Sequence, residues 1–278
     1  MHLAEWQAVR DRAHFLGNDQ EIADYAGACE FIRQLQVVLP WVTKGKQLPL
    51  PSLRAAYKRP VTREPGPVWQ WKDRLPTEKH ALYGNLARGS KVLLYPSVLP
   101  AFYRASGRTG DPEDYLVDYE EGALSYVAKQ ALDLLCVEPC FIQDLRRRLG
   151  QRGVDCTRLT GDLDDLRSKF YIGHVGVVEE GRRYGYVWDV VDRAWSEIIP
   201  LAMSMTRAEA RVQVLTALLH ASVLASARDL QRMTGWTELQ FESAMQRLWT
   251  EGTVRQVEGT DLICLTAVER AVLEGRSS

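Results

Sequence analysis

One order of elements occurs twice in the second half of the chain, and this repetition limits the folds available to it. In the first copy, three helical patterns and then two alternating, β-type runs lie at residues 124–137, 141–150, 156–171, 171–180 and 183–191. In the second copy, the same five patterns lie at 206–222, 227–235, 237–252, 253–259 and 261–266. Helix, helix, helix and hairpin is the order of a winged helix-turn-helix. The sequence therefore predicts two such units in tandem, called here the first repeat (residues 121–190) and the second repeat (residues 206–266).

The chain before the first repeat is mostly helical in pattern. Helices are predicted at 3–16, 21–38, 51–59, 69–79, 81–88 and 97–106, with a short β-rich run at 91–95. Asn18 or Asp19 would cap the helix at 21–38. We therefore expect an α+β fold, mainly α with small β elements. The predicted domains are a basic, mostly helical N-terminal domain (1–115), a first winged helix (116–200) and a second winged helix (201–278).

The charges of the chain are unevenly distributed along it. The whole chain has a net charge of −1, but residues 41–110 contain thirteen Lys or Arg against three acids, a net charge of +10. The segments on either side are acidic, with net charges of −3 for residues 1–40 and −8 for residues 111–278. This asymmetry favours a polyanionic partner such as DNA. The alternative is that these cations pair with the acidic segments on the folded surface.

The basic block supplies most of the predicted nucleic-acid-binding residues. They are Lys44, Lys46, Arg54, Lys58, Arg59, Trp69, Trp71, Lys72, Arg74 and Lys79, joined by Arg146 and Arg147 from the first repeat. Each cation could neutralise one phosphate, which would make binding strongly salt-dependent. A tryptophan could stack on a displaced base. Arg146 and Arg147 are equally compatible with a solvated helix face.

The third helix of a winged helix usually enters the major groove of DNA, but both of these third helices are acidic. They contain Asp162, Asp164 and Asp165 in the first repeat and Glu238, Glu242 and Glu251 in the second. Carboxylates in these positions repel phosphate. The two repeats are therefore predicted to serve in packing or protein interaction rather than in reading base pairs.

The segment WQWKD, residues 69–73, combines aromatic and charged side chains. In a helix, residues i and i+2 point about 200° apart, so Trp69 and Trp71 should face opposite sides, with one of them in the core. Lys72 and Asp73 would most simply pair with other groups in structural salt bridges. The alternative is that Asp73 activates a water molecule as a catalytic base.

Several functional classes find no support in the sequence. The motifs of serine hydrolases, zinc peptidases, P-loop enzymes and dinucleotide-binding folds do not occur. Five cysteines without a CxxC pair, and histidines without ligand spacing, predict neither a metal site nor a cofactor. His174 is expected to be structural. The N-terminus lacks the pattern of a secretory signal, and no apolar run reaches the length of a membrane span, so we expect a cytoplasmic protein without membrane contact.

Three segments carry a resemblance to a known family: KGKQLPLPSLRAAY, VWQWKDRLPTEKHALYGNLARGSKV and LPAFYRASG. Together with the two repeats, they resemble bacterial proteins related to the crosslink-repair DNA glycosylases of the AlkZ/YcaQ type. The resemblance implies tandem winged helices, DNA as partner, and no metal or cofactor. Those glycosylases use a Gln–apolar–Gln or Gln–apolar–Asp motif to position water, which Gln34-Leu35-Gln36 matches. They also have a β-rich C-terminal domain. We expect no such domain here, because too few residues follow the second repeat.

Three hypotheses follow, and whether the protein is an enzyme stays open among them. The first is a DNA-binding protein with tandem winged helices that acts in DNA repair or damage recognition, on double-stranded and possibly damaged DNA. The second is an active glycosylase that hydrolyses the N-glycosidic bond of alkylated bases with Asp73, or with Gln34 and Gln36. The third is a non-catalytic protein-interaction module. The sequence does not predict the oligomeric state.

Overall fold

The computed structural model describes residues 2–17, 20–42, 48–60, 66–86, 90–180 and 183–268. The N-terminal part of the chain contains α1 (Leu3–Ala13), α2 (Tyr25–Leu35), β1 (Val37–Val38), α3 (Leu53–Ala56), α4 (Pro67–Thr77), β2 (Leu82–Leu86), β3 (Ser90–Leu94), η2 (Pro96–Val98) and α5 (Leu99–Ala105). Strands β1, β3 and β2 form an antiparallel sheet in that order. The α+β fold predicted from the sequence is confirmed.

Both repeats have the predicted order of elements. After α6 (Asp114–Glu120), the first contains α7 (Tyr126–Leu135), β4 (Cys140–Phe141), α8 (Ile142–Gln151), α9 (Leu159–Ser168), β5 (Ile172–Glu180) and β6 (Arg183–Val190). The connection consists of α10 (Val191–Ala194), η3 (Ser196–Ile198) and α11 (Ile199–Met203). The second contains α12 (Arg207–Ser222), β7 (Ala225–Ser226), α13 (Ala227–Thr234), α14 (Glu238–Thr250), β8 (Val254–Gln256) and β9 (Leu262–Leu265). In each repeat, a short strand after the first helix pairs with the last strand of the hairpin.

Two predictions of local structure were wrong. Residues 81–88 were predicted as a helix, but Leu82–Leu86 form β2, which pairs with β3 from Leu82 opposite Leu94 to Leu86 opposite Ser90. All of β2 is buried, and a fully buried run has no periodicity that separates strand from helix. The helix at 21–38 ends early because Gln36 adopts φ 65°, and β1 follows. Its cap is Asp24, whose carboxylate accepts a hydrogen bond from the Gly27 N–H, whereas Asn18 and Asp19 lie outside the described residues.

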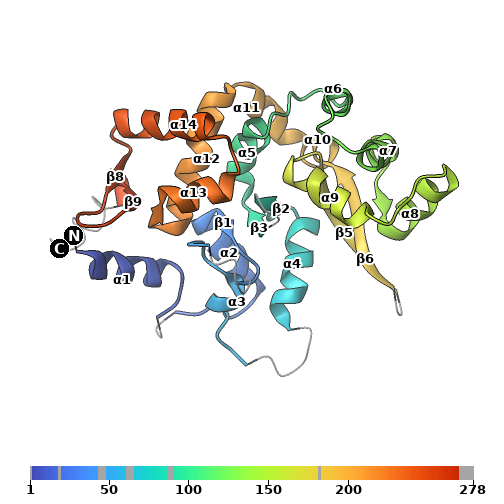
Figure 1. The fold of residues 1–278 in the computed structure, drawn as a ribbon. Helices are drawn as coiled ribbons and strands as arrows, with labels where there is room; N and C mark the ends of the chain where they lie inside the picture. The colour runs from blue at the N-terminus through green and yellow to red at the C-terminus, as the bar shows by residue number, and fades with distance from the viewer. Residues whose placement is uncertain are drawn as a thin grey trace.

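The hydrophobic cores join segments that are far apart in sequence. The first repeat has its own core, which includes Leu132, Leu145 and Leu166. The second repeat shares one core with the N-terminal sheet, where α5 packs against α12. The N-terminal helix α1 lies beside the second repeat (Figure 1), and its Trp6 packs against Val257 and other residues there. The N-terminal segment is therefore a bridge between the repeats, and the three-domain division remains a prediction.

Candidate nucleic-acid interface

Helix α4 displays the WQWKD segment and presents two different faces. Gly66 and Pro67 begin the helix, as proline is well suited to a first turn. Val68, Trp71, Lys72 and Leu75 are buried, which is the i, i+3, i+4, i+7 pattern of one helix face. Trp71 is 7% exposed, while Trp69 is 39% exposed. The prediction that the two tryptophans face opposite sides is confirmed.

Lys72 is the centre of the contact between α4 and the β5–β6 hairpin. Its side chain is only 2% exposed. The Nζ atom donates hydrogen bonds of 2.8 Å each to the hydroxyl oxygens of Tyr184 and Tyr186, and it forms an ion pair with Asp73. Tyr184 and Tyr186 are two apart in a strand, so they point to the same face of the hairpin. One buried ammonium group thus joins two segments more than a hundred residues apart.

Aromatic rings and one carboxylate compensate the buried charge. The Nζ atom of Lys72 lies 4.1 Å from the ring centre of Trp69, a cation–π distance. Tyr184 donates a 2.7 Å hydrogen bond to the second carboxylate oxygen of Asp73. Burial lowers the pKa of Lys72, and Asp73 partly opposes this shift. Both oxygens of Asp73 therefore have partners within the protein, and its predicted role as a base stays a prediction.

Three aromatic rings form a row above this lysine, called here the aromatic row (Trp41, Trp69 and Tyr184). The ring centres of Trp41 and Trp69 are 5.7 Å apart, and those of Trp69 and Tyr184 are 6.0 Å apart. Trp69 and Tyr184 are 39% and 40% exposed, and Trp41 is half-buried. Exposed aromatic faces in series are the feature on which unpaired bases stack.

Beneath the row, buried rings surround His174. Its ring stacks on Tyr186 with 4.3 Å between centres and meets Tyr83 edge-on at 5.1 Å. Neither ring nitrogen has a hydrogen-bond partner among the described residues. Burial, together with the charges of Arg167 and Lys72, lowers the pKa of His174 to about 3. The imidazole is therefore neutral at physiological pH.

Most of the other predicted phosphate contacts have partners within the protein. Arg59 pairs with Glu21, Arg74 with Glu78, Lys79 with Glu197 and Arg147 with Asp144, while Arg54 and Lys58 donate to backbone carbonyls. Arg146 is exposed on α8, and Lys44 and Lys46 lie outside the described residues. The four ion pairs are at the surface, where such pairs contribute about 0–1 kcal/mol, so a phosphate can replace the carboxylate at small cost.

The motif Gln34-Leu35-Gln36 ends α2, on the side that faces the second repeat. A ring nitrogen of His220, on α12, lies 2.8 Å from the carbonyl oxygen of Gln34. The Gln34 side chain is exposed and donates to Glu30, and the Gln36 side chain is half-buried. Gln36 has φ 65° and ψ −35°, which costs free energy for any residue except glycine. The catalytic roles of both glutamines remain predictions.

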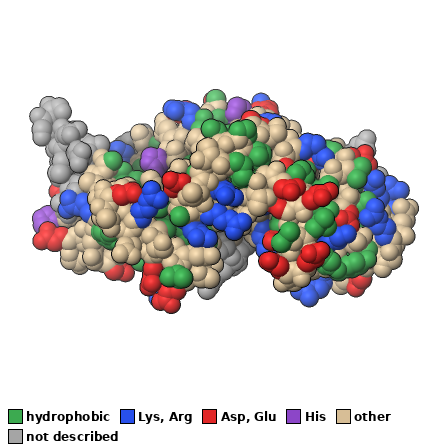
Figure 2. Space-filling view, turned by 90° about the horizontal axis from the view of Figure 1, so that it is seen from above, with side chains coloured by type: hydrophobic (Ala, Val, Ile, Leu, Met, Phe, Trp, Pro, Cys, Tyr) green, Lys and Arg blue, Asp and Glu red, His purple; other side chains and the backbone are tan. Residues whose placement is uncertain are grey.

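The two acidic third helices occupy different environments. Helix α9 packs against β2, and Asp164 of α9 accepts from Lys91 at 2.8 Å and from the Nη2 atom of Arg167. Helix α9 therefore contacts the N-terminal sheet of the same chain. Helix α14 packs on α12 and exposes Leu239. Figure 2 shows Lys and Arg gathered near the middle of one face of the molecule, beside a region rich in Asp and Glu.

A family model described as "AlkZ related" matches residues 22–235, more than half of the chain. The chain belongs to this AlkZ-related family. The solved structure of the DNA glycosylase AlkZ from Streptomyces sahachiroi is similar with a TM-score of 0.60, covering 98% of this chain and 72% of that chain at 15% sequence identity. At this identity the likeness shows a shared fold. No curated protein matches the chain.

For this AlkZ-related protein, the resemblance seen in the sequence is thus confirmed, while two parts of the interface were missed. Tyr184 and Tyr186 were not selected, although the alternation in RYGYVWDV places them and Trp188 on one strand face. Trp41 was also missed, because it lies in a proline-rich segment without a periodic pattern of apolar residues. No described helix has the length and apolarity for a membrane crossing. No group of three or more potential ligands in the described residues is arranged to hold a metal ion.

Because His174 and His14 are buried, we predict that the free energy of unfolding depends on pH. The pKa of His174, about 3 when folded, lies below its ordinary value of 6.5, so between these values the unfolded chain binds a proton that the folded chain does not. Stability therefore falls as the pH drops below 6.5, by about 2 kcal/mol per such histidine between pH 7 and pH 5. Burial lowers the pKa of His14 to about 4, which adds a similar loss.

Urea unfolding at pH 7 and pH 5 checks this account. The substitution His174→Phe keeps a ring to stack on Tyr186 and should remove about half of the pH-dependent loss. If the free energy of unfolding of His174→Phe falls between pH 7 and pH 5 by as much as that of the wild type, the account is contradicted.

Proposed function

We propose that this AlkZ-related protein binds double-stranded DNA and recognises damaged or unpaired positions through the aromatic row. The observation that carries the proposal is the row itself, in which Trp69 and Tyr184 are exposed and held in place by the buried Lys72. Large exposed aromatic rings that lie side by side are uncommon on the surface of a folded protein. Stacking on bases would account for their presence here.

The charge around the row supports the same partner. Residues 41–110, which supply Trp41 and Trp69, carry the net charge of +10. The exposed cations Arg59, Arg74 and Lys79 have carboxylate partners at the surface, and phosphate can displace such partners at small cost. Phosphate contacts would position the duplex, and the rings would test for a base that is free to leave the stack.

The test of this function compares two tryptophans of equal exposure. Trp69→Ala should weaken binding to a duplex with a single unpaired base by about tenfold, because stacking on one base contributes roughly 1–3 kcal/mol. Trp249→Ala removes a ring that is 41% exposed on α14 and should leave the affinity unchanged. Fluorescence anisotropy with labelled duplex over a series of salt concentrations measures both.

Trp69→Phe should retain most of the affinity, which separates loss of the ring from loss of folding. Wild-type affinity that falls steeply with salt is expected. No binding by the wild type at low salt, or equal affinity of Trp69→Ala and wild type for the unpaired base, would contradict the proposal.

A second candidate function is glycosylase activity, and the strained backbone at Gln36 favours it. Gln36 is one of five non-glycine residues with positive φ among the described residues, and its match to the glycosylase motif sets it apart from the other four. In this reaction water attacks the anomeric carbon, the bond to the base nitrogen breaks, and the base leaves with a proton. Gln34 and Gln36 would hold the water. Asp73 is better explained here as the counter-ion of Lys72, since both of its oxygens already have partners.

Incubation with alkylated duplex DNA, scored for abasic sites, tests the second candidate. The wild type should release the alkylated base, and Gln36→Ala should lower the rate by about a hundredfold or more. Gln143→Ala, in an exposed position on α8, serves as the control and should retain the rate. A wild type that binds such DNA and yields no abasic sites would leave DNA recognition as the function and contradict catalysis.

A further inference from the structure

A cavity of about 320 Å³ lies between the N-terminal sheet, the end of α9 and the second repeat. Residues from β2, α5, the end of α9, α12 and the α13–α14 connection line it. Its volume is within the range of sites for small molecules, roughly 300–1,000 Å³. None of the predicted site residues lines it, so the DNA-binding surface does not account for it.

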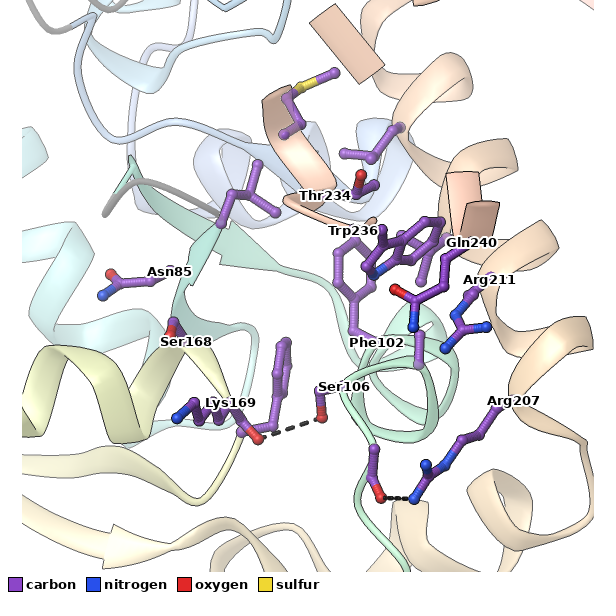
Figure 3. Close-up of a pocket in the computed structure, with 17 residues that line it drawn as sticks. Asn85, Phe102, Ser106, Ser168, Lys169, Arg207, Arg211, Thr234, Trp236 and Gln240 are labelled. Carbon is purple, nitrogen blue, oxygen red and sulfur yellow. Dashed lines mark hydrogen bonds between the residues drawn. The ribbon is translucent and has the colours of Figure 1, made fainter. Parts of the chain in front are cut away.

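The lining of the cavity has an apolar wall and a cationic wall. Phe102, Phe170 and Trp236 supply flat rings, and the centres of the two phenylalanine rings are 6.0 Å apart. Arg207 and Arg211 lie four residues apart on α12, which places them on one helix face. Figure 3 shows Arg211, Gln240 and Trp236 converging on one side. None of the described residues that line the cavity carries a carboxylate.

The side chain of Arg211 has a buried polar atom that no described residue satisfies. Its Nε atom is buried and has no hydrogen-bond partner among the described residues. Its guanidinium lies 5.9 Å from the ring centre of Trp236. Partial burial and the neighbouring charge of Arg207 both lower the pKa of Arg211, and none of the described residues that line the cavity supplies a carboxylate to compensate the charge. A half-buried cation with an unpartnered Nε–H group is stabilised by an anion that enters the cavity.

Two neighbouring groups can add donors to such an anion. The side-chain oxygen of Gln240 accepts from the Thr237 N–H at 3.3 Å, which leaves its amide nitrogen as a donor. Arg207 uses its Nη2 atom in a 2.6 Å bond to the Gly107 carbonyl, and its other N–H groups remain for a ligand. In contrast, Lys169 points away in Figure 3 and pairs with Asp165.

We infer that this cavity binds a phosphorylated nucleoside. Arg211, with Arg207 and Gln240, binds the phosphate, and the base lies against the rings of Phe102, Phe170 and Trp236. A guanidinium group can donate two parallel hydrogen bonds to phosphate oxygens, and every nucleobase has a flat face that can stack on aromatic rings. The adjoining cavity, on the other side of Gly107, has carboxylates as well as cations in its lining, whereas the carboxylate-free lining around Arg211 is the better match for a phosphate. The ligand is either a free nucleotide or the phosphorylated end of a strand, because both carry this chemistry.

Isothermal titration of the full chain with 5′-deoxyadenosine monophosphate tests the inference. The wild type should bind the nucleotide at least about tenfold more tightly than deoxyadenosine, because the phosphate supplies the charged contacts. Arg211→Gln should weaken nucleotide binding by about tenfold or more, and Arg211→Lys should lie between the two. Arg247→Gln makes the same change of charge on the exposed side of α14 and should bind like the wild type. Circular dichroism melting of each variant reports folding.

A 5′-phosphorylated oligonucleotide added as competitor identifies the source of the ligand. Displacement of the nucleotide by the phosphorylated strand, and not by its unphosphorylated form, assigns the site to strand ends, whereas no displacement assigns it to free nucleotides. Absence of nucleotide binding by the wild type, or equal affinity of a folded Arg211→Gln variant, would overturn the inference. These results are independent of the Trp69 measurements, because the variants lie in separate sites.

Discussion

The contact between Lys72 and the β5–β6 hairpin is the interaction on which the proposed DNA-binding surface depends. An ammonium group taken out of water costs several kcal/mol unless charges and hydrogen bonds replace its hydration. Here one carboxylate, two tyrosine hydroxyls and the face of Trp69 replace it. Lys72 contacts both Trp69 and Tyr184, so two of the three rings of the aromatic row meet at this contact between α4 and the hairpin. Removal of the lysine would leave Asp73 without its counter-ion and the rings without their support.

The arrangement of the two repeats explains why the proposed DNA-binding surface lies outside their third helices. Helix α9, which would usually face DNA in a winged helix, packs on β2 and directs Asp164 to Lys91. Helix α14 carries carboxylates that phosphate would avoid. The N-terminal segment fills the space between the repeats, where it shares a core with the second. The repeats therefore hold the basic segment in position, and the proposed contacts with DNA come from that segment and the hairpin.

Local patterns predicted much of this fold and less of its sites. The helices of both repeats follow from apolar spacing, and the opposite faces of Trp69 and Trp71 follow from helix geometry alone. Strand β2 was missed because its burial is set by strands and helices from other parts of the chain. The two tyrosine partners of Lys72 lie more than a hundred residues away, and no local pattern encodes such a contact. The same holds for Arg211, an ordinary helix cation in the sequence, which the fold places beside Trp236 in the lining of the cavity.

A double-mutant cycle between Lys72 and Trp69, with affinity for a duplex containing one unpaired base as the readout, tests the central claim most directly. If Lys72 holds the aromatic row together, Lys72→Met lowers the affinity about as much as Trp69→Ala does, and the double variant is no weaker than either single one. Losses that add in a folded double variant would contradict the claim, because they would show that Trp69 acts without the support of Lys72.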